Sequence, residues 1–119
     1  MNLAAFYHER GREAGAEELY REAAAIFDAA YGRDHLLALE ARIELAEVLR
    51  SESRFSESER LSRAALDPLA RMLGDHDPRV IRALWNYARL LEETRRAPQA
   101  AAIRGRIETT AEGFLGENP

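Results

Sequence analysis

The chain has 119 residues, of which 46% are hydrophobic and 32% are charged, and its formal net charge is −4. This length suits one domain with a buried core, while the negative charge and the lack of a dense basic stripe argue against a nucleic-acid partner. No apolar run reaches the roughly 18 residues of a membrane span, and the first residues lack a secretory leader, so we expect no membrane association and a cytoplasmic location.

A repeat of 42 residues runs through the chain. Glycines mark it at Gly32, Gly74 and Gly116. The residues around them recur at the same offset, as where Leu19 is matched by Leu61 and then by Ile103. Such self-similarity is the signature of stacked supersecondary units, each of which cannot bury its apolar face alone. The interval divides a single predicted domain, 1–119, into units of about 1–35, 36–77 and 78–119.

The first unit is predicted to contain two helices. A short one starts at Met1, and a longer one runs from about Glu13 to Tyr31. The opening helix is shorter than its later copies, which suggests that the sequence is part of a longer protein. Gly32 ends the long helix, because a residue without a Cβ tolerates the left-handed backbone common after a helix C-terminus.

The second unit begins where His35 is placed to cap a helix. The apolar stripe of this helix recurs at the helical period and contains Leu39, Leu45, Ala46 and Leu49. A longer helix should follow from about Ser56 to Leu73, with Ser56 and Glu59 in the spacing of a capping box. Pro68 lies inside that helix and is expected to kink it.

The third unit repeats this plan. Asp77 precedes Pro78, which pairs a capping carboxylate with a proline at the first helical position. The matching apolar stripe consists of Ile81, Leu84, Ala88 and Leu91. The last helix is predicted over about Pro98 to Leu115, with Pro98 in its first turn. Strand patterns are nearly absent, so the fold class is all-α.

Small residues stand where the two helices of each unit should cross. The pairs are Ala4 with Ala16, Ala46 with Ser58, and Ala88 with Ala100. In this the sequence resembles tetratricopeptide repeats, and its 42-residue period and the loop from Leu73 to Pro78 are similar to the kinesin light chain-like subclass. The glycine usual in that family after the first helix survives only as Gly11, since Ser53 and Arg95 replace it. The resemblance implies a right-handed solenoid of three antiparallel helical hairpins, with six helices, the first one short.

The same resemblance implies a protein-binding module whose first helices line a concave groove for a partner protein or peptide. The residues that we assign to this groove lie one or two steps off the buried stripes: His8, Glu40, Ile43, Glu47, Arg50, Arg82, Trp85, Asn86, Arg89 and Glu93.

Two features of the predicted first helix of the third unit stand out. Trp85 would be a rigid anchor if it faces the groove, but it would be core if it fills the seam against the preceding long helix. Arg82 and Arg89 are two turns apart on one face, which suits the binding of a carboxylate by paired N–H donors, although solvated arginines have the same spacing. The net charge is −3 over 1–35, −3 over 36–77 and +2 over 78–119.

The sequence contains no pattern typical of an active site. The three histidines, His8, His35 and His76, lack the spacing of metal ligands, and the glycines occur singly rather than in a phosphate-binding loop. There is no cysteine. We therefore expect no enzyme activity, no catalytic residues, no cofactor and no metal.

An alternative function is structural. The chain would then be a self-associating or interdomain spacer within a larger signalling or regulatory protein. Self-association would use the final helix, where Ile103 and Ile107 could form an apolar patch.

Overall fold

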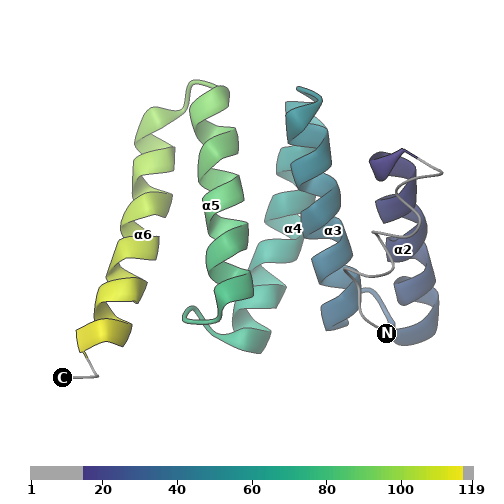
Figure 1. Cartoon of the computed structure of the whole chain (residues 1–119), viewed down its shortest axis with the longest axis horizontal. Helices are drawn as coiled ribbons and strands as arrows, with labels where there is room; N and C mark the ends of the chain where they lie inside the picture. Colours follow the sequence, from purple (N-terminus) through teal and green to yellow (C-terminus); the bar gives the residue numbers. More distant parts are fainter. Residues whose placement is uncertain (1–14, 117–119) are drawn as a thin grey trace. The chain divides into compact units, whose positions relative to one another are not determined.

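A computed structural model describes residues 15–116, and it describes side chains as far as residue 108. This part of the chain contains five α-helices and no strand, which confirms the all-α class (Figure 1). The helices are α2 (Ala16–Tyr31), α3 (Leu36–Ser51), α4 (Phe55–Leu73), α5 (Pro78–Glu93) and α6 (Ala97–Gly116). The short helix expected from Met1 lies outside the described residues, and the solenoid arrangement stays a prediction.

The chain divides into two compact units, residues 1–65 and 66–119. The division falls inside α4, and the repeat boundaries after residues 35 and 77 stay a prediction. Helix α4 continues through this point and through Pro68, which cannot donate a backbone hydrogen bond to the preceding turn. Each unit is described by itself below.

The loops before α3 and α5 have the same construction, as the repeat predicts. The imidazole of His35 accepts a hydrogen bond from the Leu37 N–H at 3.2 Å, and the carboxylate of Asp77 accepts one from the Arg79 N–H at 2.9 Å. Both predicted N-caps are therefore confirmed, with Pro78 at the start of α5. Such caps satisfy backbone donors that have no partner within the helix.

The glycines before these caps have positive φ, which is 94° at Gly32 and 85° at Gly74. The ψ of Gly32 is 158°, so this residue has an extended backbone that essentially only glycine adopts, and not the left-handed helical conformation that we expected.

The turns that follow α3 and α5 are Schellman motifs one period apart. Arg54 donates its N–H to the Leu49 carbonyl, and Arg96 donates to Leu91, each at 2.8 Å. A second hydrogen bond in each motif spans fewer residues, from the Ser53 N–H to the Arg50 carbonyl and from the Arg95 N–H to the Glu92 carbonyl. Ser53 has φ 63° and Arg95 has φ 62°. These are the two positions where the sequence lacks the glycine that is usual in the resembled family.

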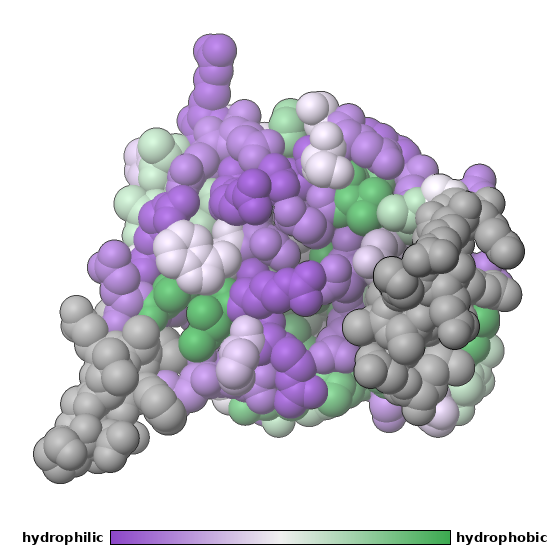
Figure 2. Space-filling view, viewed as in Figure 1, coloured by the Kyte–Doolittle hydropathy of each residue, from purple (hydrophilic) through white to green (hydrophobic). Residues whose placement is uncertain are grey.

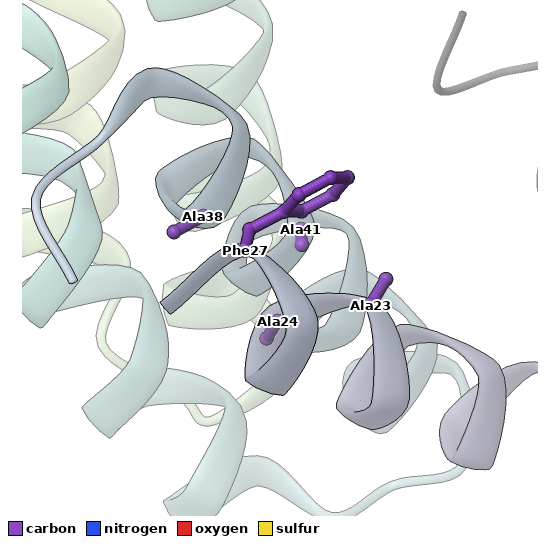
Figure 3. Close-up of a cluster of buried hydrophobic side chains, with 5 residues drawn as sticks. All are labelled: Ala23, Ala24, Phe27, Ala38 and Ala41. Carbon is purple, nitrogen blue, oxygen red and sulfur yellow. The ribbon is translucent and has the colours of Figure 1, made fainter. Parts of the chain in front are cut away.

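The core of the first unit lies where α2 packs against α3. Figure 3 shows Phe27 together with four alanines, Ala23, Ala24, Ala38 and Ala41. Small side chains let the helices approach closely, and the buried ring of Phe27 belongs to the same cluster. Arg42 joins the helices at one side, where its guanidinium binds both carboxylate oxygens of Asp28 and donates to the Arg33 carbonyl at 2.8 Å.

The start of α4 packs on α3 through the predicted small-residue crossing. The buried Ser58 hydroxyl donates to the Ala46 carbonyl at 2.6 Å. The capping box at Ser56 was a wrong prediction, because α4 begins at Phe55 and Ser56 is already its second residue. Nearby, the hydrogen bond from Arg21 lowers the pKa of Glu57 below its ordinary value.

In the second unit, α5 packs against α6. The predicted crossing pair Ala88 and Ala100 is buried. Of the predicted stripe, Leu84 and Leu91 are also buried, whereas Ile81 is half-buried and its neighbour Val80 is buried instead. Because this face of α5 is buried, the opposite face is the one that the fold presents to solvent.

Candidate functional site

The exposed face of α5 carries the five candidates that the sequence assigned to this helix. The side chains that are exposed or half-buried are Arg82, Trp85, Asn86, Arg89 and Glu93. Residues three and four apart lie on one helical face, so Trp85 stands between Arg82 and Arg89. We call these three residues the Trp85 stripe.

Trp85 is 43% exposed, and it is one of four large hydrophobic residues that the described chain exposes. The guanidinium carbon of Arg104 lies 4.7 Å from the centroid of its ring. This contact comes from α6, the following helix, whereas the sequence interpretation considered the preceding long helix. The ring is therefore partly covered from α6 and partly open to solvent.

Arg104 is itself held in place from α5. Its Nε donates to Oε1 of Glu92 at 2.6 Å, and the same carboxylate forms an ion pair with Nη2. Glu92, Arg104 and Trp85 thus form a chain of contacts across the two helices of one hairpin.

Sequence reasoning missed Arg104 and Glu92 as parts of this site. The signal that could have found Arg104 is the register of the hairpin. In the antiparallel hairpin Ala88 lies opposite Ala100. The residue three positions before Ala88 is Trp85, and it therefore lies opposite Ile103, which is three positions after Ala100 and next to Arg104.

The candidates on α3 belong to the first unit, and they divide into two kinds. Glu40 and Glu47 are half-buried. Ile43 is 7% exposed and Arg50 is 9% exposed, and the Arg50 Nε donates to Glu47 at 3.0 Å. The assignment of Ile43 and Arg50 to a binding surface is corrected, since their side chains are buried as core and as an internal ion pair.

Two further expectations concern residues elsewhere. His8 lies outside the described residues. Of the predicted apolar patch on α6, Ile107 is buried and Ile103 is half-buried, so these side chains do not form an exposed patch. On the face shown in Figure 2, hydrophilic side chains predominate and hydrophobic ones form separate small areas.

At the start of α5 the charges are paired. Arg79 donates from Nε to Oδ1 of Asp77 and from Nη2 to Oδ2, both at 2.9 Å. These bonds, together with the one from the Arg79 backbone N–H, lower the pKa of Asp77 to about 2. The carboxylate is thus committed to the cap and is not an acid–base group for chemistry.

Within residues 15–108, no three histidine, cysteine, aspartate or glutamate side chains gather closely enough to hold a metal ion. None of the described helices combines the length and the apolar character of a membrane span.

A protein-family model described as tetratricopeptide repeat matches residues 1–71, which is more than half of the chain. Repeats of this family are non-enzymatic and generally mediate protein–protein interactions. The match does not distinguish the kinesin light chain-like subclass. No curated protein matches the sequence.

Proposed function

Because the chain belongs to the tetratricopeptide repeat family, we propose that it is a protein-binding module and that the Trp85 stripe on α5 docks a segment of a partner protein. The observation that carries this proposal is the exposed indole of Trp85 between two exposed arginines. The face behind it is buried in the α5 and α6 hairpin, which makes the stripe a surface on a rigid support.

The chemistry of the stripe suits a peptide that carries a carboxylate. Tryptophan and arginine are the residues most enriched among those that dominate binding energy at protein interfaces. An arginine offers five N–H donors in a fixed plane, which matches two carboxylate oxygens at once. In the proposed complex, Arg82 and Arg89 bind carboxylates while Trp85 contributes apolar contact area.

Affinity capture with the wild-type chain as bait tests this function, with an Arg82→Ala/Trp85→Ala double variant beside it. We expect the double variant to bind the captured partner about 30-fold more weakly or worse, which is the effect of losing a hot spot of about 2 kcal/mol. Unchanged affinity would show that the Trp85 stripe is not the binding surface.

A matched control removes the same kinds of side chain from the first unit. Ile26 is an exposed hydrophobic residue of α2, and Arg33 has an exposed side chain in the following loop. The Ile26→Ala/Arg33→Ala variant should retain the wild-type affinity. Circular dichroism melting of both double variants checks that each is folded.

Light scattering at several protein concentrations distinguishes the spacer alternative from the proposed module. A self-associating spacer increases in mass as the concentration rises, whereas the proposed module keeps a constant mass and binds a different protein.

A further inference from the structure

We infer that His35 is an acid-sensitive helix cap, which holds the start of α3 at neutral pH and releases it when the imidazole is protonated. The inference goes beyond the proposed function, because it concerns the first unit and not the Trp85 stripe. Since Asp77 caps α5 at the equivalent position, the two units of one chain are expected to respond differently to mild acid.

The acceptor of the α3 cap is a nitrogen that histidine also uses to bind a proton. Nδ1 of His35 accepts the Leu37 N–H at 3.2 Å, which requires the neutral imidazole with its proton on Nε2. In the imidazolium both ring nitrogens are donors, so protonation removes the acceptor and turns two N–H groups toward each other. Histidine is the side chain whose charge ordinarily changes between about pH 5 and 8.

Protonation of His35 also places a positive charge at the start of a helix. The backbone N–H groups of the first turn carry partial positive charge, so a cation at this end is unfavourable. The first turn of α3 contains no acidic residue that would offset it. Loss of a cap changes a folding equilibrium by about fivefold, and an unfavourable charge at the helix end changes it by about twofold to fivefold.

The groups around the imidazole act in both directions. From α2, Tyr31 stacks on it with ring centroids 4.5 Å apart, and a cation over an exposed aromatic ring gains about twofold to fivefold. In the loop, Arg33 and Asp34 are exposed and opposite in charge, so their effects on an imidazolium oppose each other. From α3, Arg42 reaches the loop but is paired with Asp28. The cap and the helix end outweigh the ring, which leaves a net loss of about twofold to tenfold on protonation.

The equivalent cap of the second unit lacks this sensitivity. Asp77 accepts the Arg79 N–H through its carboxylate, and the hydrogen bonds from Arg79 hold the pKa of that carboxylate at about 2. The carboxylate therefore stays charged over the whole range in which histidine side chains titrate. Acidification from neutral pH to about pH 5 is expected to weaken the start of α3 and to leave the start of α5 unchanged.

NMR of the nitrogen-labelled full chain tests the geometry of the cap. At about pH 7.5 we expect the His35 ring to carry its proton on Nε2, as an acceptor at Nδ1 requires. The His35→Asp variant identifies the ring signals, because it removes one of the three histidines. A proton on Nδ1 at this pH would overturn the inference.

Amide hydrogen exchange then compares the two caps in one sample, with rates corrected for the intrinsic effect of pH. Between about pH 7.5 and about pH 5, we expect the protection of the Leu37 amide to fall by about twofold to tenfold and that of the Arg79 amide to stay constant. Equal protection of Leu37 at both pH values overturns the inference, and so does an equal loss at Arg79.

Two variants assign the effect to the imidazole. Aspartate is among the best helix caps and stays charged in this range, so Leu37 in His35→Asp should lose its pH dependence. The control His76→Gln removes the exposed histidine that precedes the α5 cap, and it should keep the wild-type response of Leu37. A response of Leu37 that persists unchanged in His35→Asp contradicts the role of the imidazole.

Discussion

Two helices of this protein start at equivalent caps built from different side chains. At α3 the acceptor is the imidazole of His35, and at α5 it is the carboxylate of Asp77. Both residues accept a backbone N–H two positions on, so the geometry is shared. The difference is that the carboxylate also holds Arg79 in two further hydrogen bonds.

The pH dependence of the α5 cap has a definite sign. The hydrogen bonds from Arg79 lower the pKa of Asp77 from 3.8 to about 2. A group whose pKa is depressed by folding stabilises the folded state above its unfolded pKa, and this contribution is lost as the pH falls through the folded value. Asp77 should therefore stabilise the chain fully above pH 3.8 and lose its effect by about pH 2.

An Asp77→Asn variant tests this, because asparagine caps helices about as well as aspartate but does not titrate. We expect the stability advantage of the wild type over the variant to shrink as the pH falls through this window. Urea unfolding at several pH values measures it. Wild-type and variant curves that remain parallel would contradict the role of the carboxylate.

Among the elements, the ends of α3 and α5 show a feature that is costly to the fold. Ser53 and Arg95 occupy the left-handed position of Schellman motifs, where glycine is most common. For residues with a Cβ this conformation costs roughly 1–2 kcal/mol, which exceeds the entropy that glycine loses on folding. The backbone is thus strained at Ser53 and at Arg95, in two equivalent turns.

Replacement of these residues by glycine should stabilise the chain. We expect Ser53→Gly and Arg95→Gly each to raise the free energy of unfolding by about 0.5–1 kcal/mol. Ala29→Gly, at an exposed position inside α2, is the control and should lower it by about 1 kcal/mol. Urea denaturation compares the three variants, and a loss of stability in both turn variants would show that the turns are not strained.

The sequence predicted the elements well where local chemistry decides them. His35, Asp77 and Pro78 lie at the helix starts that their side chains predict, and the long helices end at Tyr31 and Leu73 as expected. The predicted capping box at Ser56 was wrong because Phe55, one residue earlier, already has helical backbone. Caps and breakers act over a single turn, and the sequence displays them directly.

The site was less predictable, because it depends on contacts between elements. Helical spacing placed Arg82, Trp85 and Arg89 on one face of α5, but it left open whether Trp85 is exposed or core, and the structure shows that 43% of this residue is exposed. It could not show that Ile43 and Arg50 would be buried, since the amount of surface that neighbouring helices cover depends on packing. The partnership of Trp85 with Arg104 required the register of two helices, which no single helical pattern contains.

For the whole molecule, the 42-residue period of the sequence appears as a period in hydrogen bonding. The capping loops and the Schellman turns recur with the same donors and acceptors one repeat later. The chain belongs to the tetratricopeptide repeat family, whose repeats generally mediate protein–protein interactions. The central claim is more specific, namely that the binding surface is the Trp85 stripe of α5.

The most direct test of that claim is NMR of the labelled chain during titration with the captured partner. The single tryptophan provides one indole N–H signal, which reports on Trp85 alone. We expect this signal and the amides of α5 to shift as the partner binds, with smaller changes in α2. An indole signal that stays in place at saturation, with the shifts confined to residues 15–65, would contradict the account.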